Sequence, residues 1–68
     1  MIVVDQKVRF DVFADDGNGI ERLSQMVTGT VYAVNYAHEV FHVEYKAGNA
    51  MQRTSFKFSD IVEKVQVV

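Results

Sequence analysis

The chain has 68 residues, no cysteine and no proline; 49% of its residues are hydrophobic, and seven Lys and Arg against nine Asp and Glu give a net charge of −2. This composition indicates one folded domain over residues 1–68, excludes disulfides and cysteine-based zinc sites, and disfavours tight nonspecific nucleic-acid binding, which needs clustered cations. No apolar run approaches the roughly 20 residues of a membrane helix, and Asp5 follows Met1 to Val4 at once, so neither a membrane span nor a leader is predicted and a cytoplasmic location is expected.

The first predicted strand runs from Val4 to Ala14, where Val8, Phe10 and Val12 alternate with charged residues. A dense turn signal, Asp15-Asp16-Gly17-Asn18-Gly19, follows it. We therefore expect a long loop from Asp11 to Glu21 after this strand.

The segment from Ile20 to Met26 is ambiguous. Ile20, Leu23 and Val27 have helical spacing, yet the segment is too short for a stable independent helix. We expect it to be the returning arm of the loop, with a helical turn as the alternative.

Three β-runs then follow one another, at Thr28 to Tyr36, Val40 to Lys46 and Met51 to Phe58. Short turns, Ala37-His38-Glu39 and Ala47-Gly48-Asn49-Ala50, separate them, as in a meander of hairpins. Gly29 inside the first run predicts a sharp bend or a close backbone crossing.

A single helical turn is predicted at Ser59-Asp60-Ile61, with Ser59 or Asp60 as its cap. The remaining residues, Val62 to Val68, are enough for one short closing strand. The fold class is therefore all-β, a small five-stranded barrel with a long loop after the first strand.

Four short sequences fit this order of elements: Val8-Arg9-Phe10, Gly29-Thr30-Val31, Phe41-His42-Val43-Glu44-Tyr45 and Phe58-Ser59-Asp60-Ile61. They resemble the SH3-like barrels of the Tudor and KOW kind. More narrowly, the chain resembles small uncharacterised bacterial proteins that often occur with phage or mobile-element genes. The resemblance implies a five-stranded SH3-like barrel with one helical turn before the last strand. It carries a fold rather than a function.

The aromatic residues depart from two known uses of this fold. Peptide-binding SH3 domains use Trp and Pro, and this chain has neither, so recognition of proline-rich peptides is not expected. A methyl-lysine reader needs a cage of converging aromatic rings. Its members here would be Tyr32, Tyr36, Phe41 and Tyr45. A small core also needs most of its rings, so the core candidates are Tyr36, Phe41, Tyr45, Phe56 and Phe58.

No catalytic, metal or cofactor motif is present, and an enzyme is not expected. An EF-hand calcium loop would place Ala14 at position one and Gln25 at position twelve, where carboxylates are required. His38 and His42 lack a third zinc ligand, and no nucleophile motif surrounds any serine.

The leading hypothesis is a non-enzymatic SH3-like binding module with an unknown protein partner, or one that self-associates. Asp15, Asp16 and Glu21 would present carboxylates to a basic partner, with exposed Tyr32 and Tyr36 as anchors. The apolar ends of the chain could pair at the barrel seam or form a patch for homo-oligomers.

The alternative is a nucleic-acid-binding accessory protein of a phage or mobile element. Arg53 and Lys57 share one face of their predicted strand, and Lys46 lies in the neighbouring strand before it. A nearby tyrosine could stack on a base. An ordinary wet barrel surface with a cross-strand pair between Glu44 and Arg53 would explain the same residues.

Overall fold

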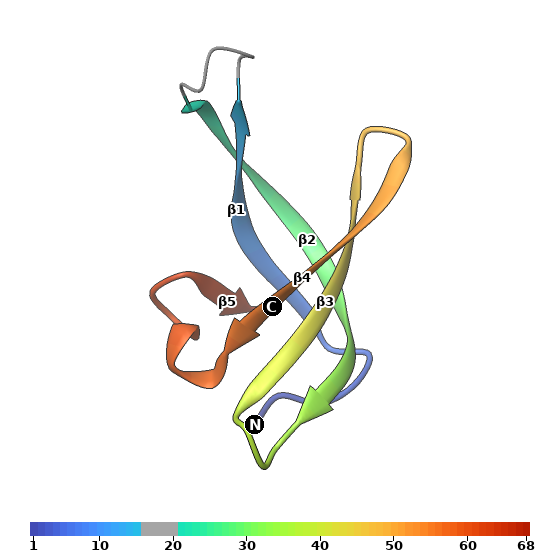
Figure 1. Ribbon diagram of the computed structural model, residues 1–68, viewed down its shortest axis with the longest axis vertical. Helices are drawn as coiled ribbons and strands as arrows, with labels where there is room; N and C mark the ends of the chain where they lie inside the picture. The colour runs from blue at the N-terminus through green and yellow to red at the C-terminus, as the bar shows by residue number, and fades with distance from the viewer. Residues whose placement is uncertain (16–20) are drawn as a thin grey trace.

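The computed structural model describes the backbone of residues 1–15 and 21–68, and the side chains of residues 1–12 and 25–68. Its elements, in order, are β1 (Lys7–Asp15), β2 (Glu21–Asn35), β3 (Val40–Ala47), β4 (Ala50–Lys57), the 3-10 turn η1 (Phe58–Asp60) and β5 (Val65–Val67) (Figure 1). The five strands form one antiparallel sheet in the order β4-β3-β2-β1-β5. The predicted all-β class, the five strands and the helical turn before the last strand are confirmed. Within the described residues no pairing joins β4 to β5, so the sheet is not closed.

The predicted long loop from Asp11 to Glu21 is wrong at both ends. Asp11 pairs with Met26 inside the β1–β2 ladder, and β2 begins at Glu21, opposite Asp15. The helical spacing of this segment is overridden because pairing with β1 satisfies its backbone hydrogen bonds. Residues 16–19 of the turn signal, and residue 20 after it, lie outside the described residues.

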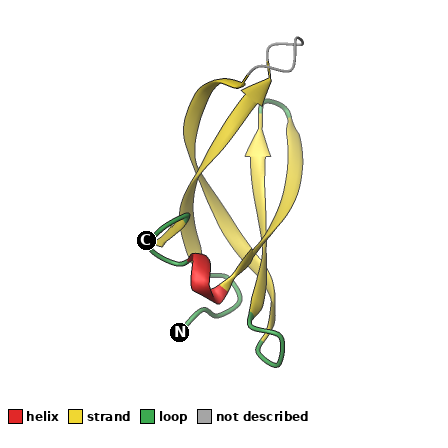
Figure 2. Cartoon of the chain, turned by 60° about the vertical axis from the view of Figure 1, so that its left-hand side comes forward, coloured by secondary structure: helices red, strands yellow, loops and turns green. Residues whose placement is uncertain are grey.

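Strand β2 has 15 residues and serves two partners in succession. Its first part pairs with β1 as far as Thr30, and its second part pairs with β3 from Gly29 onward. At Gly29 a Cβ atom would lie 2.5 Å from Val43 Cγ1 and 3.0 Å from the Glu44 carbonyl oxygen. The predicted close crossing is therefore confirmed. The β1–β2 and β3–β4 hairpins end apart from each other in Figure 1, and Figure 2 shows the same chain as strands with one short helical turn.

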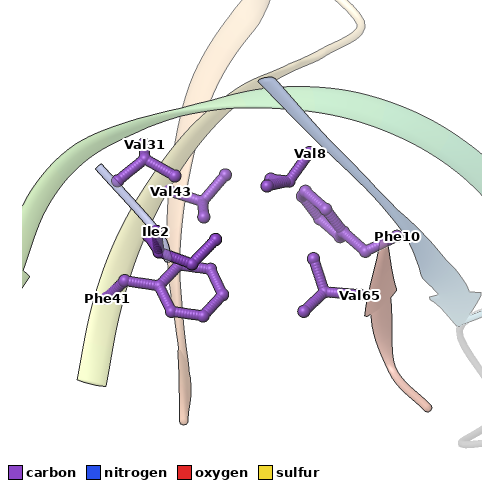
Figure 3. Close-up of a cluster of buried hydrophobic side chains, with 7 residues drawn as sticks. All are labelled: Ile2, Val8, Phe10, Val31, Phe41, Val43 and Val65. Carbon is purple, nitrogen blue, oxygen red and sulfur yellow. The ribbon is translucent and has the colours of Figure 1, made fainter. Parts of the chain in front are cut away.

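The hydrophobic core lies on one face of the sheet, called the inner face below. Seven side chains are buried there and point toward one another: Ile2, Val8, Phe10, Val31, Phe41, Val43 and Val65 (Figure 3). Of the predicted core aromatics, Phe41 is fully buried, and Tyr45, Phe56 and Phe58 pack against the cluster. Tyr36 is 49% exposed, so its placement in the core is wrong.

The N-terminal segment closes one end of this core. Its first residues do not continue β1 as predicted, because Asp5 takes a turn conformation with φ of 74°. The Asp5 amide donates to the Val31 carbonyl at 2.8 Å, and the Val31 amide donates to the Gln6 carbonyl at 2.9 Å. Ile2 is thereby held over the core, and its carbonyl accepts a hydrogen bond from the Tyr36 hydroxyl at 2.7 Å.

The pairing of the chain ends also differs from the predicted pairing at a barrel seam. β5 pairs with Val8 to Phe10 of β1, and the Val68 amide donates to the Lys7 carbonyl at 3.1 Å. Asp60 is the residue that caps η1, since its Oδ2 accepts from the Lys57 amide at 2.9 Å. Across the described ranges, no helix has the length and apolar character needed to cross a bilayer.

Candidate functional site

A β-bulge lies in β2 at Tyr32. Val31 pairs with Val43 and Ala33 pairs with His42, so Tyr32 is an extra residue between two regular pairs. Because Val31 faces the core, strand alternation places Tyr32 on the opposite face, called the outer face below, where it is 38% exposed. The bulge keeps Ala33 on the same face as Tyr32.

Arg53 lies across the Tyr32 ring. Its Cζ atom is 4.9 Å from the ring centroid, within the range of a cation–π contact. Its Nε lies 4.0 Å from Glu44 Oε1, and the two residues are partners in the β3–β4 register. This confirms the expected cross-strand pair. Because the Arg53 side chain is 67% exposed, the pair contributes at most about 1 kcal/mol.

His42 completes the surroundings of Tyr32. Its Nδ1 lies 2.7 Å from Ser55 Oγ, its partner in the β3–β4 register, so the hydrogen bond fixes the imidazole ring. The ring centroid is 6.0 Å from that of Tyr32, at an interplanar angle of 35°. The term "Tyr32 face" below means this group: Thr30, Tyr32, His42, Glu44, Arg53 and Ser55.

At the Tyr32 face, a row of polar residues crosses four strands of the sheet. Lys7, Thr30, Glu44 and Arg53 are successive partners across β1, β2, β3 and β4. Lys7 Nζ donates to Thr30 Oγ1 at 2.6 Å, which holds this cation beside the Tyr32 face.

The charged side chains of the strands segregate to the outer face. Strand alternation and the register place five of the seven cations there, all exposed: Lys7, Arg9, Lys46, Arg53 and Lys57. Among the described strand side chains only two acids share the face, Asp11 and Glu44. Counting the described side chains alone, five cations less two acids leave an excess of +3 on this face, whereas the whole chain carries −2.

The predicted cationic residues do share one face. Lys57 lies opposite Val40 near η1, and Lys46 lies opposite Met51 near the β3–β4 turn. At about 3.3 Å per residue, Arg53 and Lys57 are about 13 Å apart along β4. The cations are therefore spread over the outer face, and Arg53 lies between Lys46 and Lys57 along the β3–β4 ladder.

The predicted acidic contact residues lie at the other end of the β1–β2 hairpin. Asp15 and Glu21 are partners in the register, and the structure does not describe their side chains. Asp16 lies outside the described residues. Their role in binding stays a prediction of the sequence.

The aromatic cage is not formed. Phe41 is fully buried, and Tyr45 packs edge-on against Phe10 at 5.1 Å on the inner side of the sheet. Tyr36 packs against Phe58 at 6.0 Å, and its hydroxyl is bound to Ile2. Only Tyr32 presents its ring on the outer face, so these four rings do not converge.

Two features of the site were not predicted from the sequence: the bulge at Tyr32, and the convergence of His42 and Arg53 on the Tyr32 ring. The local signal for the bulge was the apolar run Val31 to Val34, where alternation fails. Within residues 1–12 and 25–68, no cluster of three or more His, Cys, Asp or Glu could hold a metal ion.

No family model matches the chain, and no curated protein and no solved structure matches it either. The interpretation of the Tyr32 face therefore rests on its own residues.

Proposed function

We propose that the protein is a non-enzymatic SH3-like binding module that contacts a macromolecular partner through the Tyr32 face. Three features support the SH3-like part of this proposal: β5 lies beside β1, β2 is shared between β1 and β3, and a single 3-10 turn precedes β5. In such a fold the two halves of the sheet curl around one core, which is the arrangement expected for a domain this small.

The exposed, fixed ring of Tyr32 carries the proposal. Aromatic and arginine side chains dominate binding energies because they bury much area at a small entropic cost. Here the bulge, His42 and Arg53 hold Tyr32 in place on the surface. A partner would therefore meet a largely preorganised contact.

A photo-crosslinking amino acid at position 32 tests this directly in cells. We expect crosslinks from position 32 and few from position 26, where Met26 is 50% exposed near the far end of β2. The crosslinked material also shows whether the partner is a protein or a nucleic acid. Equal crosslinking from both positions, or none from position 32, would refute the placement.

A second candidate contact is the acidic end of the β1–β2 hairpin. It is favoured by one observation: the register brings Asp15 and Glu21 opposite each other, next to Asp16 in the chain. This end would bind a basic protein. Replacing Asp15 and Asp16 by Asn should then remove partners from a pull-down, and an unchanged set of partners would exclude it.

Self-association remains part of the same proposal. The exposed apolar residues near the chain ends would serve it: Met1, Val3 and Val4 at the N-terminus, and Val62, Val67 and Val68 at the C-terminus. Sedimentation over a range of protein concentrations should reveal a dimer. A monomer at every concentration would remove this form of the proposal.

A further inference from the structure

The described side chains of the outer face carry a net positive charge, although the chain as a whole carries a net negative charge. Five cations on one side of the sheet raise the local concentration of anions there. The described acids outside the strands lie in turns or near the ends, at Asp5, Glu39, Asp60 and Glu63. The excess of +3 among the described side chains of the outer face therefore favours an anionic ligand.

The Tyr32 face adds a flat ring to this charge. Proteins that bind single strands combine a cationic surface for phosphates with aromatic rings on which bases stack. Lys7 and Arg53 lie on either side of Tyr32, in the row that crosses the sheet at Thr30 and Glu44. We infer that the Tyr32 face binds single-stranded nucleic acid, with a base on Tyr32 and phosphates on Lys7 and Arg53. This inference rests on the proposed function.

A single strand fits better than a duplex because Tyr32 stands on the surface of a sheet. Bases inside a duplex are stacked on one another and present only their edges. The Tyr32 ring, fixed between His42 and Arg53, cannot reach the faces of bases inside a duplex. The bases of a single strand are free to stack on it.

Arg53 can change partner at little cost. Its ion pair with Glu44 is 4.0 Å long and largely in solvent, and its contact with Tyr32 is also exposed. A phosphate would offer the guanidinium a shorter, bidentate contact. Moving Arg53 to a phosphate also uncovers one side of the Tyr32 ring for a base.

Glu44 opposes the ligand. Its carboxylate lies in the middle of the row, between Thr30 and Arg53, where it repels phosphates and competes for the guanidinium. Removing this charge should therefore strengthen binding. A purely structural role of Glu44 predicts the opposite or no change.

The test is a fluorescence anisotropy titration with labelled oligothymidylate of about 12 nucleotides, a length within the range that small single-strand binders cover. We expect binding at low salt that weakens as salt is raised, with a log–log slope of about −1.4 for the two phosphate contacts of Lys7 and Arg53. Tyr32→Ala should weaken binding by about 5- to 100-fold, since each stacked base contributes that much. Circular dichroism confirms that the variant is folded.

Charge variants separate a defined site from diffuse attraction. Lys7→Ala and Arg53→Ala should each reduce the slope by about 0.7, and Glu44→Gln should tighten binding a few-fold. The matched control is Lys64→Ala, because Lys64 pairs with Asp60 at 3.6 Å and lies between η1 and β5, outside the strands. It should leave the slope unchanged.

Any of four results would overturn the inference. The first two are no binding at low salt, and an affinity for duplex DNA of the same length equal to that for the single strand. The other two are a loss of slope in Lys64→Ala equal to that in Lys7→Ala, and competition by polyglutamate as strong as competition by unlabelled oligonucleotide. The last would assign the face to an acidic protein. In each case crosslinking from position 32 to a protein would leave the proposed function intact, so the two failures can be distinguished.

Discussion

The two faces of the sheet are made of alternate residues of the same strands, yet they differ in almost every property. The seven core side chains of the inner face are valine, isoleucine and phenylalanine with exposures of at most 3%, and this face holds none of the described charges. The outer face holds five of the cations and one fixed tyrosine. Stability should therefore depend on one face and binding on the other, so substitutions can affect each separately.

Phe41→Ala should have the largest effect, because Phe41 is fully buried and contacts both Phe56 and Phe58. We expect a loss of about 3–5 kcal/mol in the free energy of unfolding, which is most of the stability of a small domain. Urea denaturation followed by circular dichroism measures it. The matched variant Tyr32→Ala on the outer face should change stability by about 0.5 kcal/mol or less. Equal losses in the two variants would contradict the separation of the faces.

Gly29→Ala should have the next largest effect. The added Cβ would meet Val43 Cγ1 at 2.5 Å and the rigid Glu44 backbone at 3.0 Å, so β2 and β3 would have to move apart. We expect a loss of about 1–3 kcal/mol in thermal or urea unfolding. Thr28→Val is the control, since Thr28 is exposed one residue away and keeps its β-branched shape. A neutral Gly29→Ala would mean that the crossing is not tight.

Tyr36→Phe tests the segment that closes the core. It removes the hydroxyl that donates to the Ile2 carbonyl at 2.7 Å and leaves the contact with Phe58. We expect a loss of about 0.5–1.5 kcal/mol in unfolding free energy. Faster amide exchange around Asp5 and Val31 should accompany it, since those hydrogen bonds hold the same segment. Unchanged stability would show that this hydroxyl contributes nothing.

The smallest effect is expected for the ion pair on the outer face. A double-mutant cycle with Glu44→Gln and Arg53→Gln should give a coupling of less than about 1 kcal/mol in unfolding free energy, because both side chains reach solvent. A coupling well above this value would mean that the pair stabilises the fold. Arg53 would then not be free to move to a phosphate.

Much of the fold was predictable where turn chemistry and alternation agree. Gly48 takes the positive φ of 63° expected at its two-residue turn, and that turn fixes the β3–β4 register. The pairing of Glu44 with Arg53 follows directly from this register. The Arg53–Ser55–Lys57 face was predictable for the same reason.

The remaining features of the fold depend on strand pairing, which no local sequence pattern reveals. Residues 21–26 form a strand because β1 lies beside them, although their apolar spacing is helical. No glycine or asparagine marks the bulge at Tyr32, so the sequence predicted an exposed Tyr32 but not the bulge. The orientation of the Tyr32 ring against both His42 and Arg53 depends on side-chain packing that the sequence alone does not give.

The most direct test of binding at the Tyr32 face is to map chemical shifts by NMR on the ¹⁵N-labelled protein as oligothymidylate is added. Shifts should concentrate at Thr30, Tyr32, His42, Glu44 and Arg53, and the amides of the inner-face residues Val8 and Val65 should hardly move. Shifts centred on the β1–β2 hairpin end, or spread evenly over the chain, would contradict it.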